Sequence, residues 1–161
     1  MPNSDDKLQA YTSTVEHINE VRKLLRIIVQ ELLKRGDDHD KSKLSEEEFK
    51  VFTTFTSRLK TLTYGSEEYK ECIREMKPAL DHHYSVNSHH PEFYDNGIDG
   101  MNLIDIVEMF CDWWAASKRH ADGDIRKSLE INTERFKMSP QLVSILKNTV
   151  NDLEMINPVN L

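Results

Sequence analysis

Cysteine and glycine are both scarce in this sequence. Only Cys72 and Cys111 occur, in no spacing typical of a structural metal site, so we expect two reduced thiols in a cytoplasmic protein rather than a disulfide. Only five glycines occur, and few windows alternate between apolar and polar residues as half-buried strands do. Both observations favour a helical fold over a β-rich one.

Long apolar runs and an excess of basic residues are missing as well. The most apolar stretch, residues 24–33, is interrupted by Arg26, Gln30 and Glu31, so we expect no transmembrane helix and no membrane partner. The 21 basic and 28 acidic side chains give a net charge of −7, which argues against binding to long nucleic acids. A small phosphorylated ligand in a local basic pocket remains compatible with this charge. The oligomeric state stays open.

What the sequence does contain is helical periodicity. Its 161 residues suit one domain, and the apolar spacing predicts a long first helix over about residues 6–35, closed by Gly36 in a left-handed conformation. We therefore expect an all-α fold: a single compact bundle of about six or seven helices over residues 1–161. The later helices are predicted from residue 45, and over about residues 66–84, 102–120, 124–136 and 140–155.

Several residues mark the predicted helix boundaries. Ser45 and Glu48 form the pattern of a capping box, and Pro78 is expected to kink or divide the helix that contains it. Tyr64-Gly65 predicts a turn, and Ser139-Pro140 predicts the start of the last helix. Residues 85–101 form the most loop-like segment, rich in Asn, Asp, Gly and Pro.

The histidines are the most informative residues. Imidazole is the commonest protein ligand of divalent transition metals, and carboxylates complete such sites. In the segment His39-Asp40, between two predicted helices, adjacent side chains can converge on one ion. Six of the seven histidines fall in three groups: His17, His39, and the pairs His82-His83 and His89-His90.

Each of these candidates has a simpler explanation. His17 lies on the apolar face of the first predicted helix, where a core histidine with one hydrogen bond would also fit. The two histidine pairs could belong to a solvated polar loop.

Asp112 is the carboxylate on the fourth predicted helix that we expect to bind a metal. Its neighbours are small or apolar, and a carboxylate there is costly unless it is paired or bound to a cation. Asp105 and Glu108 lie nearer the helix N-terminus, where the helix dipole already favours acids.

The order of His17, His39-Asp40, the later histidines and Asp112 resembles the HD-domain superfamily of metal-dependent phosphohydrolases. The segment HDKSK looks like the HD-x-G-K motif of the HD-GYP branch with Ser42 in place of glycine, and HHPE before DNGIDG is similar to that branch's double histidine. The Gly-Tyr-Pro triplet is absent, which argues against cyclic-dinucleotide hydrolysis. More closely, HDKSKLSEEEF, HHYSVNSHHPEFY and EMFCDWWAAS resemble a short, poorly characterised bacterial and phage family over about residues 15–120.

The resemblance implies an HD-domain-like helical fold with a metal-site core over about residues 15–120 and C-terminal helices over 122–155. It also implies one ion, or two bridged by Asp40, drawn from Mn, Fe, Co or Zn, which the sequence does not distinguish. The ligands implied for these ions are His17, His39, Asp40, His83, His90 and Asp112.

The implied activity is hydrolysis of a small phosphorylated molecule, most simply a nucleotide, by metal-activated water. Asp40 and Lys43 are the implied catalytic residues, although Lys43 could be an ordinary surface lysine. Two alternatives use the same ligands: a di-iron oxygenase and a non-catalytic metal-dependent nucleotide-binding protein. A purely structural helical protein is the third. The residues expected to contact substrate are Lys43, His82, His89 and Arg119, with Phe93, Trp113 and Trp114 as base-stacking candidates or core aromatics.

Overall fold

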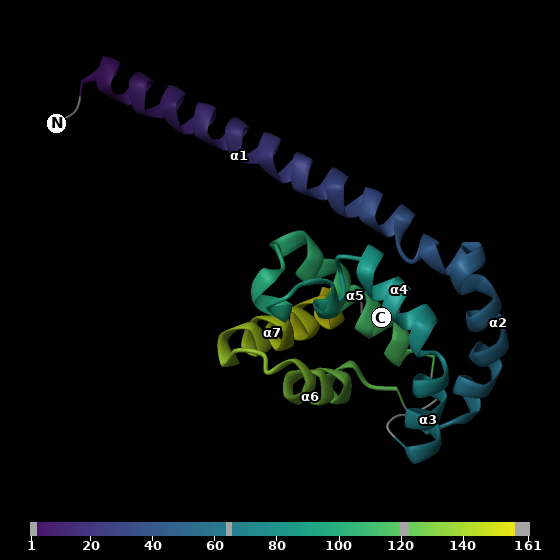
Figure 1. The fold of residues 1–161 in the computed structure, drawn as a ribbon. Helices are drawn as coiled ribbons and strands as arrows, with labels where there is room; N and C mark the ends of the chain where they lie inside the picture. The colour runs from purple at the N-terminus through teal and green to yellow at the C-terminus, as the bar shows by residue number, and fades with distance from the viewer. Residues whose placement is uncertain (1–2, 64–65, 120–122, 157–161) are drawn as a thin grey trace. The chain divides into compact units, whose positions relative to one another are not determined.

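The computed structural model describes residues 3–63, 66–119 and 123–156, and over these residues the chain is all-helical, as predicted (Figure 1). Seven α-helices and three short 3₁₀ helices follow one another, and the described residues contain no strand. The α-helices are α1 (Ser4–Asp38), α2 (Glu46–Thr61), α3 (Glu67–Glu75), α4 (Lys77–Val86), α5 (Leu103–Ser117), α6 (Ile125–Phe136) and α7 (Pro140–Ile156). The 3₁₀ helices are η1 (Lys41–Leu44), η2 (Pro91–Phe93) and η3 (Gly97–Gly100).

The chain divides into two compact units, Met1–His39 and Asp40–Leu161. The single domain with a metal-site core over about residues 15–120 stays a prediction. Helix α1 makes up the first unit, and none of its side chains is buried. Only the second unit is a helical bundle with a core of its own.

The long helix α1 begins and ends differently from the prediction. Asn3 caps its N-terminus: the side chain accepts from the Asp6 amide at 2.8 Å, and the Asp6 carboxylate accepts from the Asn3 amide at 3.0 Å. The predicted stop at Gly36 is wrong, because the helix continues through it to Asp38. The left-handed residue is Asp40, with φ of +57°, a conformation that aspartate tolerates better than most residues.

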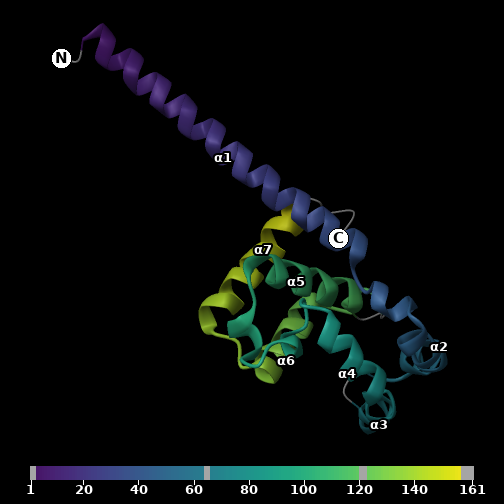
Figure 2. The same cartoon turned by 45° about the horizontal axis from the view of Figure 1, so that its top comes forward.

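The core of the second unit is made by α5, α6 and α7. Buried side chains from all three helices pack together, and Trp113 stacks on Phe136 with ring centroids 5.8 Å apart. Figure 2 shows these three helices side by side. Trp113 and Trp114 thus belong to the core, the simpler of the two roles expected for them. The buried core members are Phe110, Trp114, Ile125, Leu129, Met138, Leu146 and Val150.

Most predicted helix boundaries are confirmed. Pro78 sits in the first turn of α4 and divides the expected third helix into α3 and α4. Ser66, Asp124 and Ser139 each accept a hydrogen bond from a backbone amide at the start of α3, α6 and α7. Tyr64-Gly65, His120 and Asp122 lie outside the described residues. Along the described chain, no helix combines the length and the apolar character needed to cross a membrane.

Candidate metal centre

Asp40 lies at the middle of a cluster of histidines in the second unit. Its Oδ1 is 3.2 Å from His83 Nε2 and 3.6 Å from His89 Nε2. His90 adds a third imidazole, with its Nε2 2.9 Å from His83 Nε2. Each of these four residues offers a ligand atom, and the four atoms all lie within 4.8 Å of one another.

Local structure explains how residues far apart in sequence meet here. The left-handed turn at Asp40 precedes η1, and His83 projects from α4, which packs on both η1 and α2. His89 and His90 lie in the short segment between α4 and η2, and Pro91 fixes the start of η2. Three histidines from the two predicted His-His pairs, together with Asp40, therefore supply the cluster.

Glu48 orients His83. The glutamate is fully buried, and its Oε2 lies 3.0 Å from His83 Nδ1, where an ionised carboxylate can only accept. The tautomer assigned from this contact carries the proton on Nδ1, so the Nε2 lone pair faces Asp40 and His90. Ser42 Oγ also donates to Glu48 Oε2, at 3.1 Å.

Glu108 orients His89 in the same way. Its Oε1 lies 3.1 Å from His89 Nδ1, and both residues are buried. The proton assigned to Nδ1 again leaves the Nε2 lone pair on the side of Asp40. Two buried carboxylate–histidine pairs thus point their Nε2 atoms toward one carboxylate oxygen, the arrangement by which proteins orient histidine ligands of metals.

The donor spacing fits a transition metal. Ligands about 2.1 Å from an ion in tetrahedral or octahedral geometry are about 3.0–3.4 Å from one another. The measured separations are 2.9 Å between His83 and His90, 3.2 Å between His83 and Asp40, and 3.6 Å between His89 and Asp40. Three imidazole nitrogens and one carboxylate oxygen suit Mn, Fe, Co or Zn rather than Ca or Mg.

His90 is held in its neutral form. Burial, followed by the neighbouring imidazoles of His89 and His83, lowers the pKa of His90 to about 3. A neutral imidazole retains the lone pair that a metal requires. The charge of the Asp112 carboxylate raises the pKa of His90, so the Asp112 carboxylate lies close to the cluster.

Two further predicted residues, the acidic Asp112 and the basic Lys43, lie close to Asp40. Asp112 is half-buried, and one of its carboxylate oxygens lies within 4.8 Å of one from Asp40. Lys43 forms an ion pair with Asp40 Oδ2, and its ammonium lies 5.2 Å from the centre of the Phe52 ring. Lys43 thus lies beside Asp40 at this centre, and its phosphoryl contact stays a prediction.

His17 is not brought to Asp40. It precedes His39 by 22 residues along the continuous helix α1, and a rise of about 1.5 Å per residue separates the two by about 33 Å. Because Asp40 is bonded directly to His39, one ion cannot have both His17 and Asp40 of the same chain as ligands. Sequence periodicity placed His17 on an apolar face, but it could not show that the helix leads that face away from the ligands.

The remaining candidates lie at the edges of the centre or elsewhere. His82 is partly exposed, and its Nδ1 is 2.7 Å from Glu48 Oε1, so it shares the carboxylate that orients His83. Arg119 is exposed, just beyond the end of α5. His39 is the C-cap residue of α1 and ends the first unit.

The sequence analysis missed the two orienting glutamates. Glu48 was assigned to a capping box, but Ser45 makes no side-chain cap hydrogen bond, and Glu48 points into the protein instead. Glu108 was attributed to the helix dipole. A signal was present for Glu48, which has Leu44 and Phe52 four residues before and after it, where an acid is costly without a partner. Glu108 shares its helix face with Asp105 and Asp112, so apolar spacing did not mark it.

Comparison with known proteins assigns a family but no activity. No curated protein and no solved structure matches the chain. A family model matches residues 6–152, which include all but the first two residues of α1 and every residue of the centre described above. The chain belongs to DUF5662, a family of unknown function.

Proposed function

We propose that Asp40, His83, His89 and His90 bind a divalent transition metal, and that the protein uses it to hydrolyse a small phosphate ester, most simply a nucleotide. The observation that carries the proposal is the convergence of two glutamate-oriented histidines on Asp40 Oδ1. Buried carboxylates and imidazoles at this density are costly without a cation to bind. Asp112 is proposed as an additional ligand, for this ion or for a second one, and the metal-binding role of His39 stays a prediction.

A metal bound here supplies Lewis acidity and lowers the pKa of coordinated water from 15.7 to about 7. The chain's own residues do the rest. Lys43 pairs with Asp40, and Glu48 and Glu108 contact the Nδ1 atoms of His83 and His89, so that the Nε2 atoms face the metal. His82, partly exposed and bonded to Glu48, is placed to transfer a proton to a leaving group.

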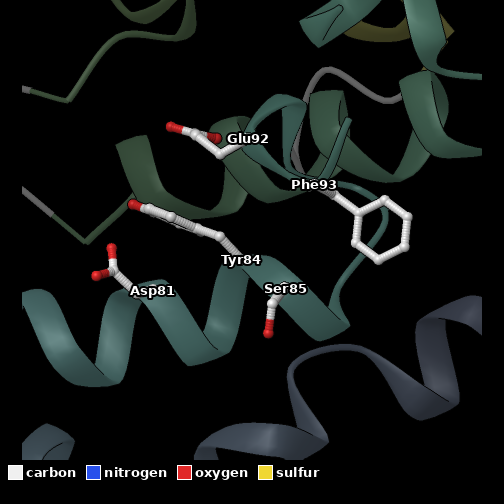
Figure 3. A pocket seen from close by; sticks show the side chains of 5 residues that line it. All are labelled: Asp81, Tyr84, Ser85, Glu92 and Phe93. Carbon is white, nitrogen blue, oxygen red and sulfur yellow. The ribbon is translucent and has the colours of Figure 1, made fainter. Parts of the chain in front are cut away.

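A pocket beside the centre could hold the uncharged part of the substrate. Its volume is about 500 Å³, and the Tyr84 ring in its wall lies 4.9 Å from the His90 ring (Figure 3). Phe93 offers an exposed aromatic face for stacking, and two carboxylates can accept from hydroxyl or amino groups. Both carboxylates are already ion-paired, Asp81 with Lys77 and Glu92 with Arg135, so we place the phosphate at the metal and the base or sugar here. The lining residues are Asp81, Tyr84, Ser85, Glu92 and Phe93.

Metal content measured by plasma mass spectrometry tests the site. We expect one or two equivalents of transition metal in the untagged protein, and loss of metal in Asp40→Ala and His83→Ala. His17→Ala is the matched control, because it removes an imidazole about 33 Å along α1 from His39. Loss of metal in the control, or full metal in the two site variants, would refute the assignment.

Phosphate release from nucleoside mono-, di- and triphosphates, with Mn²⁺ or Co²⁺ added, tests the activity. Turnover that disappears in Asp40→Ala supports the hydrolase. Bound iron with oxygen consumption would instead indicate an oxygenase, and a nucleotide recovered unchanged from the metal-loaded protein would indicate a binding protein. We also infer a cytoplasmic location, which the two free cysteines support.

A further inference from the structure

The helix α1 exposes an unusual amount of apolar surface. It is 35 residues long, about 52 Å, and none of its residues is buried. Isolated apolar residues on a surface are ordinary, but a continuous set of this size marks an interaction site. The large apolar residues exposed on α1 are Leu8, Tyr11, Ile18, Val21, Leu24, Leu25, Ile27, Ile28, Val29 and Leu33.

Part of this surface follows the repeat of a coiled coil. Eight positions are separated by alternating steps of three and four residues over four heptads, and seven of the eight are apolar or aromatic. This 3.5-residue period is typical of helices that pair along their whole length, because it keeps one seam facing the partner. The eight seam positions are Leu8, Tyr11, Val15, Ile18, Arg22, Leu25, Val29 and Leu32.

The two halves of α1 carry opposite charge. Residues 4–20 contain four carboxylates and one lysine, a net charge of −3. Residues 21–36 contain five basic side chains and one glutamate, a net charge of +4, and two aspartates follow beyond the seam. Two parallel copies would place like charges together, whereas two antiparallel copies place each acidic half beside a basic half.

One antiparallel register satisfies both the seam positions and the charges. Antiparallel coiled coils pair the first seam position of one heptad with the second of the partner, and a register with Leu8 opposite Leu32 satisfies this rule at every layer. The same register sets Asp6 opposite Lys34. We propose that α1 forms an antiparallel coiled coil with α1 of a second copy, in this register. The layers pair Leu8 with Leu32, Tyr11 with Val29, Val15 with Leu25, and Ile18 with Arg22.

Arg22 is the exception that fixes the register. It lies two positions from the two-fold axis at residue 20, so the two arginines flank the centre of the dimer. A charged residue at one seam position lowers stability but disfavours shifted pairings, in which it would face other apolar layers. Arg22→Leu should therefore tighten the dimer while allowing other registers.

Oligomeric state tests the proposal directly. Light scattering after size-exclusion chromatography of the full chain, at tens of micromolar, should give twice the monomer mass. Leu25→Glu should give a monomer, because it places two charges in the seam. Leu24→Glu is the matched control: the two leucines are 53% and 55% exposed, but Leu24 lies off the seam. A monomeric wild type, or equal behaviour of the two variants, would overturn the proposal.

Disulfide trapping tests the direction of pairing, in a Cys111→Ser background because Cys111 is exposed. A mixture of Leu8→Cys and Leu32→Cys chains should form a cross-linked heterodimer, and neither variant alone should cross-link. Cross-linking of each variant with itself would show a parallel pair and refute the register. Circular dichroism checks that each variant keeps its helices. Arg22→Leu should lower the dimer dissociation constant, and a misfolded variant would not show this gain in affinity.

Discussion

Glu48 shows how one residue can organise several others. Its two oxygens lie within hydrogen-bond distance of Ser42 Oγ and of the Nδ1 atoms of His82 and His83, at 2.7 to 3.1 Å. A buried carboxylate with three partners is held in one position, and its contact with Nδ1 assigns the ring proton of His83 to that nitrogen. The chemistry proposed at Asp40 therefore depends on a side chain that does not contact Asp40 in this structure.

Replacing Glu48 by glutamine should weaken metal binding without removing a ligand. The amide can present its NH₂ group to His83 Nδ1, which favours the tautomer with the proton on Nε2, toward the metal. We expect affinity to fall about 10- to 100-fold, as for other orienting partners of metal-bound histidines. Competition with a chelator measures this change. Glu47→Gln, at the exposed neighbouring position, should leave affinity unchanged.

His90 should make the stability of the metal-free protein depend on pH. Its pKa is about 3 in the folded chain and near 6.5 when unfolded, so between these values the unfolded state binds more protons. The free energy of unfolding should therefore rise with pH across this window, by up to about 1.4 kcal/mol per unit from this group. Urea titrations of chelator-treated protein from pH 4 to 7 measure the slope. It should flatten in His90→Gln and persist in His17→Gln, and an unchanged slope in His90→Gln would contradict the assignment.

At the scale of elements, α5 connects the core to the metal centre. Phe110 and Trp114 project into the core with α6 and α7, while Glu108 reaches His89. Near its N-terminus, Asp105 accepts hydrogen bonds from Ser88 Oγ at 2.8 Å and from Tyr94 OH at 2.7 Å. The helix therefore holds the segment that carries His89 and His90.

Asp105→Ala should loosen that segment. It leaves the Ser88 and Tyr94 hydroxyls without their acceptor and removes a helix-capping carboxylate, so we expect a loss of about 1–3 kcal/mol in unfolding free energy. Metal affinity should fall with it, because His89 and His90 lose their fixed positions. Denaturant unfolding and chelator competition measure the two effects. Ser88→Ala, which removes one of these bonds, should have a smaller effect on both, and an equal effect would contradict this role for Asp105.

At the scale of the whole molecule, stability and metal binding should be separable. Leu129 is fully buried in the core, and Leu129→Ala should cost about 2–5 kcal/mol by leaving a cavity. The metal ligands come from α4, the segment after it and the turn before η1, so stoichiometry should remain as in the wild type at temperatures where the protein is folded. Thermal unfolding and metal analysis check both parts. Ile131→Ala, on the exposed side of α6, should change neither.

The sequence by itself determined the helical class, most helix boundaries and the residue types of the metal centre. Boundaries depend on local rules such as the capping residues Ser66, Asp124 and Ser139, and on Pro78, and these act over a few residues. Clustered histidines beside Asp40 indicated a metal site for the same reason, because unusual residue types are visible without a fold.

Only the tertiary structure decided which of these residues meet. Glu48 and His83 are 35 positions apart, and Glu108 and His89 belong to different elements, so no local pattern pairs them. His17 was predicted as a ligand from its order in the chain, but order carries no distance, and the continuous helix α1 keeps it from Asp40. Packing depends on which distant segments contact one another. For that reason the sequence indicated the residue types of the candidate site, and the tertiary structure showed which of these residues lie together.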